Sequence, residues 1–464
     1  MRVPSFGRGC ACERPGSAAR AASAVDPRRG ATVRGGVTTS IPIRRALVSV
    51  SDKGNLETLA RVLVDCKVEV LSTGGTYRAL CELGVAVEKV SDYTGAPEIL
   101  GGRVKTLHPR IHGGILAAPT AEHDQERERH DIPAIDLVVV NLYPFREVIR
   151  DPGCDLARAV ENIDIGGPTM VRAAAKNAAR VTVIVDPSDY GRVGQALAEN
   201  GGAVPESLRR DLARKAFAHT AAYDAAIAAY LAGEADTEQT SAPPVVFAGG
   251  PRHGTLRYGE NPHQVAGLYA VAGEPDEAPG LPQALVLQGK ALSYNNLLDA
   301  DAALGIIRDL QPLGTAAAVF KHASPCGAAV GRAGESLAEV YRKAREADAE
   351  SAFGGIVSVS EQVDTATAEQ IAETFIEVVI APGYSTGARE VLARKKNLRL
   401  LELPQMFAAG PPPWRLRSVA GGVLLQREDV MHVGAAAASV ATKTTPTAEQ
   451  MIDLEVAWRV AKHV

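Results

Sequence analysis

Past residue 45, short apolar runs rich in Val, Ile and Leu alternate with longer stretches in which apolar residues recur every three or four positions. The first pattern is typical of buried strands and the second of amphipathic helices. In the first half of the chain we predict strands at residues 46–50, 68–71, 135–141 and 181–185, and helices at residues 56–66, 76–83 and 205–231. This alternation indicates an α/β fold with a parallel sheet and crossover helices.

The same alternation resumes further along, after a stretch of different composition. Residues 233–250 are rich in Ser, Pro, Gly and acidic residues, which is typical of a linker. We therefore expect one domain at residues 45–232, a linker at 233–250 and a second α/β domain at 251–464. In the second domain we predict strands at residues 316–320, 355–359 and 378–381. A chain of 464 residues is long enough for two such cores.

The first 44 residues differ from the rest. Residues 1–45 hold nine arginines, no lysine and only two acidic residues, Glu13 and Asp26, and they show no apolar periodicity. We expect residues 1–44 to be a disordered leader. An Arg-rich, acid-poor leader is typical of an organelle transit peptide. The alternative, which we favour, is a start codon assigned too far upstream, with translation beginning near Val37.

Each predicted strand of the first domain leads into a polar or glycine-rich turn. Three of these turns lie at residues 51–54, 72–76 and 141–144. Because ligands of open α/β sheets bind at the carboxyl ends of the strands, we expect the turns to converge on one site. Residues 72–76 read Ser-Thr-Gly-Gly-Thr before a predicted helix. They are a candidate phosphate cradle, since backbone N–H groups at a helix start bind anions.

The segment 101–114 concentrates cationic, hydroxyl and imidazole side chains between paired glycines. The glycines permit positive φ and Pro109 prevents a continuous helix, so we expect a shaped loop. Arg103 and Lys105 would project to the same side of an extended segment, where a phosphate or a developing oxyanion is held. Pro109 also separates His108 from His112, which argues against a helical pair of metal ligands.

Further polar residues of the first domain add to this chemistry. Asn141 and Tyr143 place an amide and a phenol at the end of a predicted strand, Asp164 precedes a glycine turn, and Lys176 lies in a predicted helix of small residues. A carboxylate, a phenol and two lysines can polarise a carbonyl, position an amide nucleophile and deliver a proton. Singly, each has a structural interpretation, since Asp before Gly commonly forms a turn. Their combination indicates a site.

Two segments of the second domain gather reactive side chains. Residues 257–264 read Arg-Tyr-Gly-Glu-Asn-Pro-His-Gln, and residues 321–327 read Lys-His-Ala-Ser-Pro-Cys-Gly after a predicted strand. Neighbours on a strand point to opposite faces, so Lys321 and His322 reach one ligand only where the strand ends. The imidazole is a candidate general base and the ammonium a candidate partner for an oxyanion. The alternative is ordinary surface charge.

Composition excludes several classes of protein. Hydrophobic residues make up 46% and charged residues 22% of the chain, as in ordinary soluble globular proteins. The net charge of −4 gives no reason to expect nucleic-acid binding. No apolar run is long enough to span a bilayer, so we expect no membrane partner. The six cysteines lack the paired spacing of a disulfide framework, which favours a reducing cytoplasm.

Zinc chemistry is disfavoured by the residues themselves. Pro325 and Cys326 are similar to the Pro-Cys-x-x-Cys motif of zinc deaminases, but residue 329 is Ala and the expected Glu does not follow His322. We therefore expect no metal at this site. No pattern in the sequence indicates whether a monovalent cation is required.

Eight motifs, met in order along the chain, carry a resemblance to a known family. They are Ser-Val-Ser-Asp-Lys (49–53), Leu-Ser-Thr-Gly-Gly-Thr (71–76), Gly-Gly-Arg-Val-Lys-Thr-Leu-His-Pro (101–109), Asn-Leu-Tyr-Pro-Phe (141–145), Asn-Ile-Asp-Ile-Gly-Gly (162–167), the 257–264 and 321–327 segments, and Ser-Ala-Phe-Gly-Gly (351–355). From about residue 45 to 464 the chain resembles the bifunctional phosphoribosylaminoimidazolecarboxamide (AICAR) formyltransferase/IMP cyclohydrolase family. This resemblance implies formyl transfer from 10-formyltetrahydrofolate to AICAR, and then dehydrative closure of formyl-AICAR to IMP.

For the first domain the resemblance implies a methylglyoxal-synthase-like fold and the cyclohydrolase activity. It implies catalytic roles for Lys105, Tyr143, Asp164 and Lys176. The residues implied to bind the nucleotide are Ser51, Lys53, Ser72, Thr73, Gly74, Arg103, Thr106 and Asn141.

For the second domain the resemblance implies cytidine-deaminase-like subdomains that lack zinc. His322 would be the base for the amine of AICAR, and Lys321 would lie near the transferred formyl group. The residues implied to shape the nucleotide and folate pockets are Arg257, Tyr258, Asn261, His263, Asn296, Phe353, Gly354 and Glu377. Members of the family are homodimers, so we expect a homodimer in the cytoplasm.

The end of the sequence departs from the family pattern. A helix predicted from Thr445 and Pro446 runs to Val464, and neither the family's Lys-Ser-Asn-Ala-type motif nor its later folate-region motif occurs in the 464 residues. We expect an incomplete last subdomain and impaired formyl transfer. The alternatives are a chain competent only as a cyclohydrolase and a nucleotide-binding module without catalysis.

Overall fold

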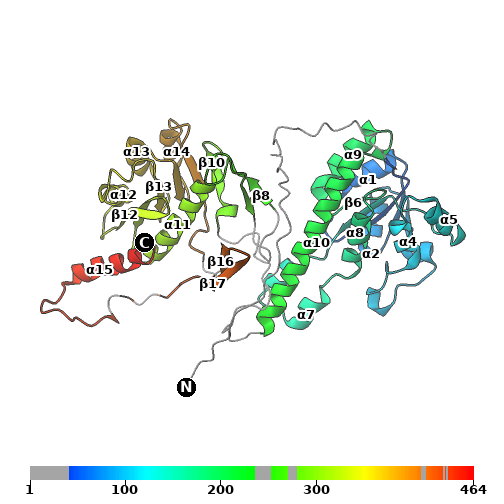
Figure 1. The fold of residues 1–464 in the computed structure, drawn as a ribbon, viewed down its shortest axis with the longest axis horizontal. Coiled ribbons are helices and arrows are strands. Elements are labelled where there is room, and N and C mark those ends of the chain that lie inside the picture. The colour runs from blue at the N-terminus through cyan, green and yellow to red at the C-terminus, as the bar shows by residue number, and fades with distance from the viewer. Residues whose placement is uncertain (1–40, 236–251, 270–279, 409–413, 432–433, 435–436) are drawn as a thin grey trace, which may run out of the picture. The chain divides into compact units, whose positions relative to one another are not determined.

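The structure is a computed structural model that describes residues 41–235, 252–269, 280–408, 414–431, 434 and 437–464 (Figure 1). Residues 1–40 of the expected leader and residues 236–250 of the expected linker lie outside the described residues. Two α/β bodies are described, one at residues 41–235 and one that begins at residue 252.

The first body is built on a five-stranded sheet of order β4-β3-β2-β5-β6, in which every pairing is parallel. The central strands β2 and β5 are rich in Val and Leu, as expected of strands that are covered on both faces. The four strands predicted for this half are confirmed to within two residues at each end. The sheet consists of β2 (Arg45–Val50), β3 (Glu69–Ser72), β4 (Val87–Lys89), β5 (Leu137–Asn141) and β6 (Thr182–Ile184).

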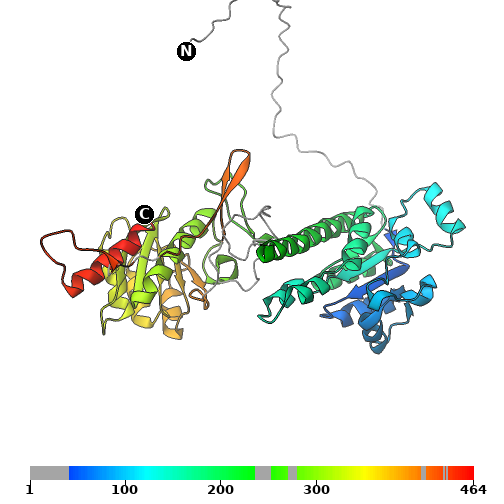
Figure 2. The ribbon, with the colours of Figure 1, turned by 90° about the horizontal axis from the view of Figure 1, so that it is seen from below.

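Helices cover both faces of this sheet (Figure 1, Figure 2). On one face α1 and α9 pack against alternate strand residues such as Val48, and on the other α4, α8 and α10 pack against residues such as Leu47. These five helices are α1 (Leu56–Asp65), α4 (Pro109–Leu116), α8 (Gly166–Lys176), α9 (Tyr190–Glu199) and α10 (Glu206–Ala235). The shorter elements are β1 (Ile41–Pro42), α2 (Gly74–Glu82), α3 (Val90–Thr94), η1 (Leu100–Gly102), α5 (Ala121–Arg129), α6 (Phe145–Arg150), α7 (Leu156–Glu161), η2 (Pro187–Asp189) and β7 (Ala203–Val204).

Three expectations from the sequence are corrected in this body. Residues 41–44 belong to the fold instead of the leader, because apolar Ile43 is buried and β1 pairs with β7. The long helix α10 continues to Ala235, so the first three residues of the expected linker are helical. Residues 109–114 of the expected loop are helical, because Pro109 begins α4 and the first turn of a helix tolerates proline.

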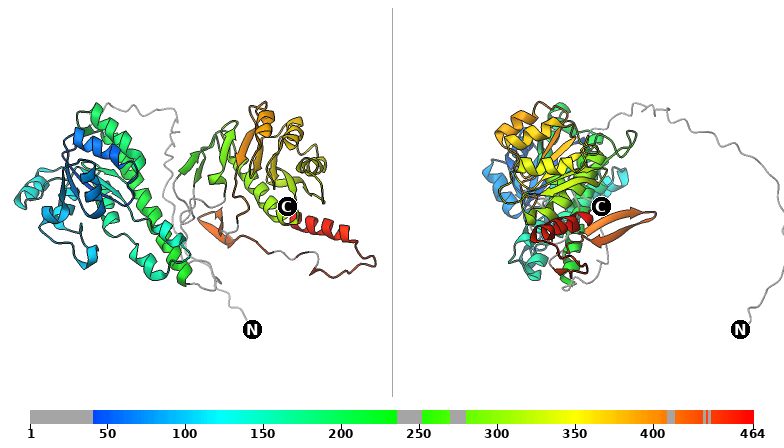
Figure 3. Two further views of the ribbon diagram at one scale, coloured as in Figure 1. Left: turned by 180° about the vertical axis from the view of Figure 1, so that it is seen from behind. Right: turned by 90° about the vertical axis from the view of Figure 1, so that its left-hand side faces the viewer.

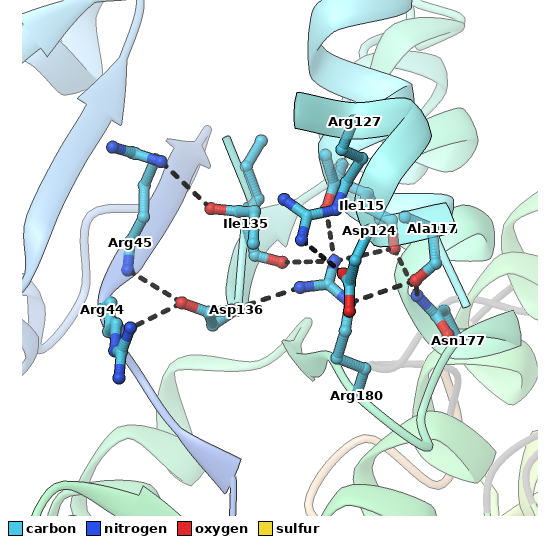
Figure 4. Close-up of polar contacts among 12 residues, drawn as sticks. Arg44, Arg45, Ile115, Ala117, Asp124, Arg127, Ile135, Asp136, Asn177 and Arg180 are labelled. Atoms are coloured by element: carbon cyan, nitrogen blue, oxygen red, sulfur yellow. Dashed lines mark hydrogen bonds and ion pairs between the residues drawn. The ribbon is translucent and has the colours of Figure 1, made fainter. Parts of the chain in front are cut away.

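A buried polar network holds together the amino ends of the central strands (Figure 4). One oxygen of Asp136 accepts hydrogen bonds from the backbone N–H groups of Arg44 and Arg45 at 3.0 and 3.1 Å. The other lies 3.3 Å from the Arg180 guanidinium, which also donates to the carbonyl oxygens of Ala117 and Ile135. Both ionised side chains are about nine-tenths buried. The network lies at the edge of the sheet opposite to the carboxyl ends of the strands.

The second body contains a six-stranded mixed sheet of order β10-β15-β14-β13-β11-β12. The neighbours β13, β14 and β15 are parallel, whereas β11 runs antiparallel to both β12 and β13. The predicted strands at residues 316–320, 355–359 and 378–381 are confirmed as β11, β13 and β14. The sheet consists of β10 (Leu285–Gln288), β11 (Ala316–Lys321), β12 (Ser324–Val330), β13 (Ile356–Val359), β14 (Val378–Ala381) and β15 (Arg399–Glu402).

Helices again cover the two faces of the sheet (Figure 3). α11 packs on one face, and α12, α13 and α14 pack on the other. α15 contacts α11 and β12. The helices are α11 (Tyr294–Leu310), α12 (Leu337–Glu346), α13 (Thr365–Glu373), α14 (Thr386–Leu392), α15 (Ala448–Ala461), η3 (Leu281–Gln283) and η4 (Gln311–Leu313), and two hairpins pair β8 (Arg252–Thr255) with β9 (Gly267–Tyr269) and β16 (Trp414–Val419) with β17 (Gly422–Arg427). Among the described residues no helix is long and apolar enough to cross a bilayer.

Candidate functional site

The three polar turns of the first body meet at the carboxyl ends of β2, β3 and β5. The side-chain oxygen of Asn141 accepts hydrogen bonds from the backbone N–H groups of Ser51 and Asp52 at 2.5 and 2.9 Å, which ties the end of β5 to the end of β2. The Thr76 hydroxyl accepts a hydrogen bond from the Val50 N–H at 3.0 Å and so ties α2 to β2. The predicted convergence of these turns is confirmed.

Two ammonium groups flank the start of α2. A Cβ atom added to Gly74 would lie 3.8 Å from Lys105 Nζ, and one added to Gly75 would lie 3.8 Å from Lys53 Nζ. Gly74 has φ 54°, a left-handed conformation that favours glycine. Free N–H groups and the positive end of the helix dipole also point outward here. The arrangement is suited to a phosphate, and the neighbouring Ser72 is buried, with its hydroxyl donating to the Val48 carbonyl.

The loop that carries Lys105 is folded back on itself. Ile99 and Val104 pair as an isolated antiparallel bridge, and Leu100, Gly101 and Gly102 all have positive φ. A Cβ atom on Gly102 would lie only 2.7 Å from Lys105 Cε, so the side chain of Lys105 occupies the space that glycine leaves. The paired glycines are therefore required both by the turn and by the close approach of Lys105.

The expectation that Arg103 and Lys105 share one side of an extended segment is wrong. Arg103 adopts helical backbone angles at the end of the turn, and its guanidinium pairs with Glu161 at the end of α7. Lys105 instead lies 3.3 Å from Glu98. Because the backbone turns between them, the two cations have different partners.

Asp164 lies just before α8, next to Tyr143, which follows the end of β5. Its carboxylate accepts a hydrogen bond from the Gly167 N–H at 2.8 Å and another from the Tyr143 backbone. Burial nevertheless raises the pKa of Asp164 above its usual value, and the two backbone bonds offset only part of this effect. Buried Thr106 connects the start of α8 to the Lys105 loop, because a Cβ atom on Gly166 would lie 3.1 Å from the Thr106 hydroxyl.

Sequence reasoning missed Tyr223, which holds the Asp164 loop from α10. Its hydroxyl accepts a hydrogen bond from the Asp164 N–H at 2.9 Å and donates one to the Asn162 carbonyl at 3.2 Å. The ring is buried and packs edge-on against Phe145. The partner lies about sixty residues further along the chain, so no local motif identifies it.

Lys176 is the one predicted catalytic residue of the first body that lies apart from the others. It ends α8, ten residues after the helix starts, which corresponds to about 15 Å along the axis. There it lines a surface hollow with His112, Arg172 and Phe217. Burial lowers the pKa of His112, whose Nε2 atom has no hydrogen-bond partner among the described residues.

In the second body Lys321 and His322 lie at the end of β11, as the sequence predicts. Lys321 pairs with Ser324 across a two-residue turn, and both turn residues, His322 and Ala323, have positive φ (54° and 57°). Non-glycine residues adopt this conformation at a cost of about 1–2 kcal/mol each. Asp299 of α11 holds the turn by accepting a hydrogen bond from the Ala323 N–H at 2.7 Å. The sequence contains no signal for this partner.

An exposed aromatic surface lies beside Lys321. The Lys321 ammonium donates a hydrogen bond to the Phe353 carbonyl at 3.0 Å, and the Phe353 ring, 60% exposed, packs against Phe375 at 5.4 Å. Gly354 has φ 78°, and its N–H donates to the Phe375 carbonyl at 2.7 Å. An exposed phenylalanine next to a cation is suited to a planar ring that carries negative groups.

Asn296 and Glu377 lie together, as their predicted shared role requires. The Asn296 side chain donates a hydrogen bond to Glu377 at 2.9 Å, and its oxygen caps the start of α11 by accepting from the Ser293 N–H. Arg399, which sequence reasoning missed, lies 3.5 Å from the same Glu377 oxygen. Asn296 is only 5% exposed, and its side-chain amide is bonded to Glu377.

Residues 257–264 form a turn attached to the start of α11. The backbone of Arg257 bonds to Leu292 at 2.9 Å and that of Tyr258 bonds to Tyr294 at 3.1 Å, which places the segment next to Asn296. The Arg257 guanidinium lies over the Tyr258 ring, 5.2 Å from its centre. Asn261 bonds to the Gln264 side chain, and His263 lies exposed in the turn.

No group of three or more His, Cys, Asp or Glu side chains that could hold a metal ion occurs in the described part of the chain. Cys326, near the zinc-deaminase-like Pro-Cys pair, is partly buried. Burial raises the pKa of its thiol, which favours the neutral form over the thiolate that binds metals.

Family models and similar proteins identify the same family, and they match most of the chain. The chain matches a family described as "AICARFT/IMPCHase bienzyme" over residues 174–464 and one described as "MGS-like domain" over residues 55–169. Proteins named "Bifunctional purine biosynthesis protein PurH" are 52% identical in Anaeromyxobacter dehalogenans and 48% identical in Desulfitobacterium hafniense. Each alignment covers 91% of this chain, and it covers 81% and 80% of the respective relatives.

A solved structure titled "Crystal structure of ForH" is also similar, at 45% sequence identity and a TM-score of 0.38. The aligned region covers 40% of this chain and 95% of the chain in that structure. The sequence relatives, which extend over both bodies, therefore decide the family.

Proposed function

The chain belongs to the AICARFT/IMPCHase bienzyme family, and we propose that its two bodies divide the two activities of that family between them. The protein is a bifunctional enzyme of purine biosynthesis, an AICAR formyltransferase and an IMP cyclohydrolase, and it carries out the last two steps of IMP formation. We assign ring closure to the domain at residues 45–232 and formyl transfer to the domain at residues 251–464. The family assignment thus favours the bifunctional interpretation over a non-catalytic module.

The observation that carries the first assignment is the pair of ammonium groups at the start of α2. The N–H groups of Gly74 and Gly75 with Lys53 would bind the phosphate of formyl-AICAR. Lys105, beside the same helix end, would polarise the formyl oxygen as the carboxamide nitrogen attacks the formyl carbon. Removing one such donor typically costs about 10²–10³ in turnover.

Asp164 and Tyr143 would complete the chemistry of ring closure. A carboxylate with a raised pKa accepts a proton more readily than an ordinary one, which suits Asp164 to take the proton that the carboxamide nitrogen loses. The half-exposed phenol of Tyr143 would donate to the oxygen that leaves as water. Ser51, Ser72, Thr73, Arg103, Thr106 and Asn141 would shape the nucleotide site around these groups.

Lys176 needs a separate interpretation within this proposal. It lies at the far end of α8, so we assign it no contact with the reacting atoms that Lys105 approaches. Its neighbours, among them His112 and Arg172, give that end of the helix a concentration of cationic and imidazole groups. Its contribution to ring closure stays a prediction.

In the second body we propose that His322 removes a proton from the amine of AICAR as it attacks the formyl carbon. Lys321 would stabilise the oxyanion that forms there. The strained turn supports this assignment, because unfavourable backbone conformations persist chiefly where the surroundings hold them and often mark functional sites. Phe353, with Gly354, would face the ring of the formyl donor, while Arg257, Tyr258, Asn261, His263, Asn296 and Glu377 would line the nucleotide side.

Three finer points belong to the same proposal. The formyl donor would be 10-formyltetrahydrofolate, whose planar ring suits the exposed Phe353. The enzyme would be a cytoplasmic homodimer; apolar side chains exposed on the β16–β17 hairpin, such as Val423 and Leu424, offer a surface that a second copy would cover. Light scattering of the purified protein tests the dimer.

One substitution, measured on both reactions, tests the division of labour. Lys105→Ala should lower the turnover of formyl-AICAR to IMP by about 10²–10³, with a smaller change in KM, because the ammonium acts mainly on the transition state. The same variant should release tetrahydrofolate from AICAR and the formyl donor at the wild-type rate. Ring closure at the wild-type rate in Lys105→Ala would remove this residue from the mechanism.

A further inference from the structure

One carboxylate at the first site has no part in the chemistry assigned so far. One oxygen of Glu98 accepts a hydrogen bond from the Thr73 hydroxyl at 2.6 Å, and the other lies 3.3 Å from Lys105 Nζ. Both partners belong to the site that we assign to ring closure. Glu98 is therefore the group through which the start of α2 and the Lys105 loop are joined.

The backbone of the loop places Glu98 opposite Lys105. Because Ile99 and Val104 pair in an antiparallel bridge, the residues just outside that pair, 98 and 105, face each other on one side of the loop. The bridge closes only because three successive residues, including both glycines, adopt positive φ. The glycine-rich turn thus serves to bring a carboxylate and an ammonium together.

Thr73 supports the same interpretation from the other side. It is the residue before the first turn of α2, where a threonine hydroxyl commonly accepts a hydrogen bond from the helix backbone. No such cap is formed here, and the hydroxyl donates to Glu98 instead. The hydrogen bond from Thr73 and the charge of Lys105 both lower the pKa of Glu98, so that the side chain is ionised near neutral pH.

Holding the Lys105 ammonium in place reduces the conformational entropy that must be lost when substrate binds. A lysine side chain has four rotatable carbon–carbon bonds, and confining it costs up to about 2 kcal/mol of conformational entropy. At the site the Lys105 side chain is partly exposed, at 29%, so packing alone does not confine it. An ion pair with a carboxylate that is itself hydrogen-bonded to α2 keeps the ammonium over the helix end before substrate arrives.

We propose that Glu98 is a positioning residue for ring closure, which fixes the Lys105 ammonium and the Thr73 hydroxyl at the start of α2. This proposal rests on the proposed function, because it requires Lys105 to act on the substrate. Glu98 itself touches neither the reacting atoms nor the phosphate. Its loss should therefore lower kcat through Lys105 and leave a protein that still folds.

The test is a double-mutant cycle measured on ring closure of formyl-AICAR. The variants are Glu98→Gln, Lys105→Met and the two together, with Glu126→Gln on exposed α5 as a matched loss of one carboxylate. Glu98→Gln should lower kcat about tenfold, and it should have no further effect when Lys105 is already Met. Glu98→Asp, which keeps the charge, should recover part of the loss. Glu126→Gln should behave as wild type, and all variants should melt within a few degrees of it.

Two outcomes overturn the proposal, and they differ from failure of the proposed function. Wild-type kcat in Glu98→Gln, or the same loss from Glu98→Gln in both backgrounds, shows that Glu98 does not act through Lys105. If Lys105→Met itself closes the ring at the wild-type rate, the assigned role of Lys105 falls, and the positioning role of Glu98 falls with it. Thermal melting of each variant separates these results from simple unfolding.

Discussion

At the scale of single residues, three of the charged groups that we assign to ring closure are held by another part of the protein. Lys105 is paired with Glu98, Arg103 with Glu161, and the Asp164 carboxylate with backbone N–H groups. Charges arranged in this way need little reorganisation when substrate binds, which is the main advantage of a prepared electrostatic site. The arrangement also has consequences for stability.

Asp164→Asn should make stability less dependent on pH. Burial raises the pKa of Asp164, so the folded state binds the proton more tightly than the unfolded state does. The contribution of Asp164 to the stability of the wild type therefore falls as pH rises from about 4, the usual Asp value, through the raised pKa, and levels off above it. The asparagine lacks this fall, so the difference in unfolding free energy between variant and wild type should grow in favour of the variant across that window.

Urea unfolding at a series of pH values measures this effect. One backbone N–H loses its acceptor in the variant, which adds an offset that does not depend on pH. Turnover of formyl-AICAR should fall strongly in the same variant. Stability curves that run parallel across the acidic range would show that burial does not disfavour the Asp164 carboxylate.

At the scale of elements, the buried strands are the part of the fold that the sequence predicts best. The strand predicted at residues 378–381 is β14 itself, because a parallel strand covered on both faces appears as an unbroken apolar run. By contrast α5 contains almost no apolar residue and is stabilised by the Thr120 cap and by its charged side chains. The sequence of α5 therefore shows no apolar periodicity from which a helix could be predicted. The hairpin of β11 and β12 was missed because its turn residues, His322 and Ala323, are not the usual Asn-Gly.

The same limit applies to the candidate sites. The motifs identify the residues with chemical groups, such as Lys105, Asp164 and Lys321, because these lie in short local patterns. The residues that hold them are Glu98, Tyr223, Asp299 and Arg399, and their roles depend on a turn or on a distant helix or strand. Local sequence carries no information on such pairings. The distance between Lys176 and the other groups likewise follows only from the straightness of α8.

Asp136→Asn should destabilise the first body by about 3 kcal/mol. The change leaves the Arg180 charge buried without its counter-ion, and removing one partner of a buried pair is costly. Chemical denaturation measures the loss. Asp131→Asn is the matched control, because the pair of Asp131 with Arg110 is exposed on the aspartate side and should contribute no more than about 1 kcal/mol. Equal effects of the two substitutions would contradict the importance of the buried pair.

At the scale of the whole molecule, we assign two consecutive reactions to two separate sheets. The first site uses the carboxyl ends of a parallel sheet, the usual ligand position in such folds. The second lies at a hairpin turn of a mixed sheet, beside the start of α11. Since the described sites share no residue, blocking one reaction should leave the other intact.

The most direct test of this division measures IMP formed from AICAR and 10-formyltetrahydrofolate by Lys105→Ala, by His322→Ala and by a mixture of both. Each variant alone should produce little IMP, because one of its two steps is blocked. The mixture should restore IMP formation toward the rate of the wild-type chain, since His322→Ala can close the formyl-AICAR that Lys105→Ala releases. A mixture as inactive as its components, or wild-type IMP formation by either variant alone, would contradict the assignment of one reaction to each body.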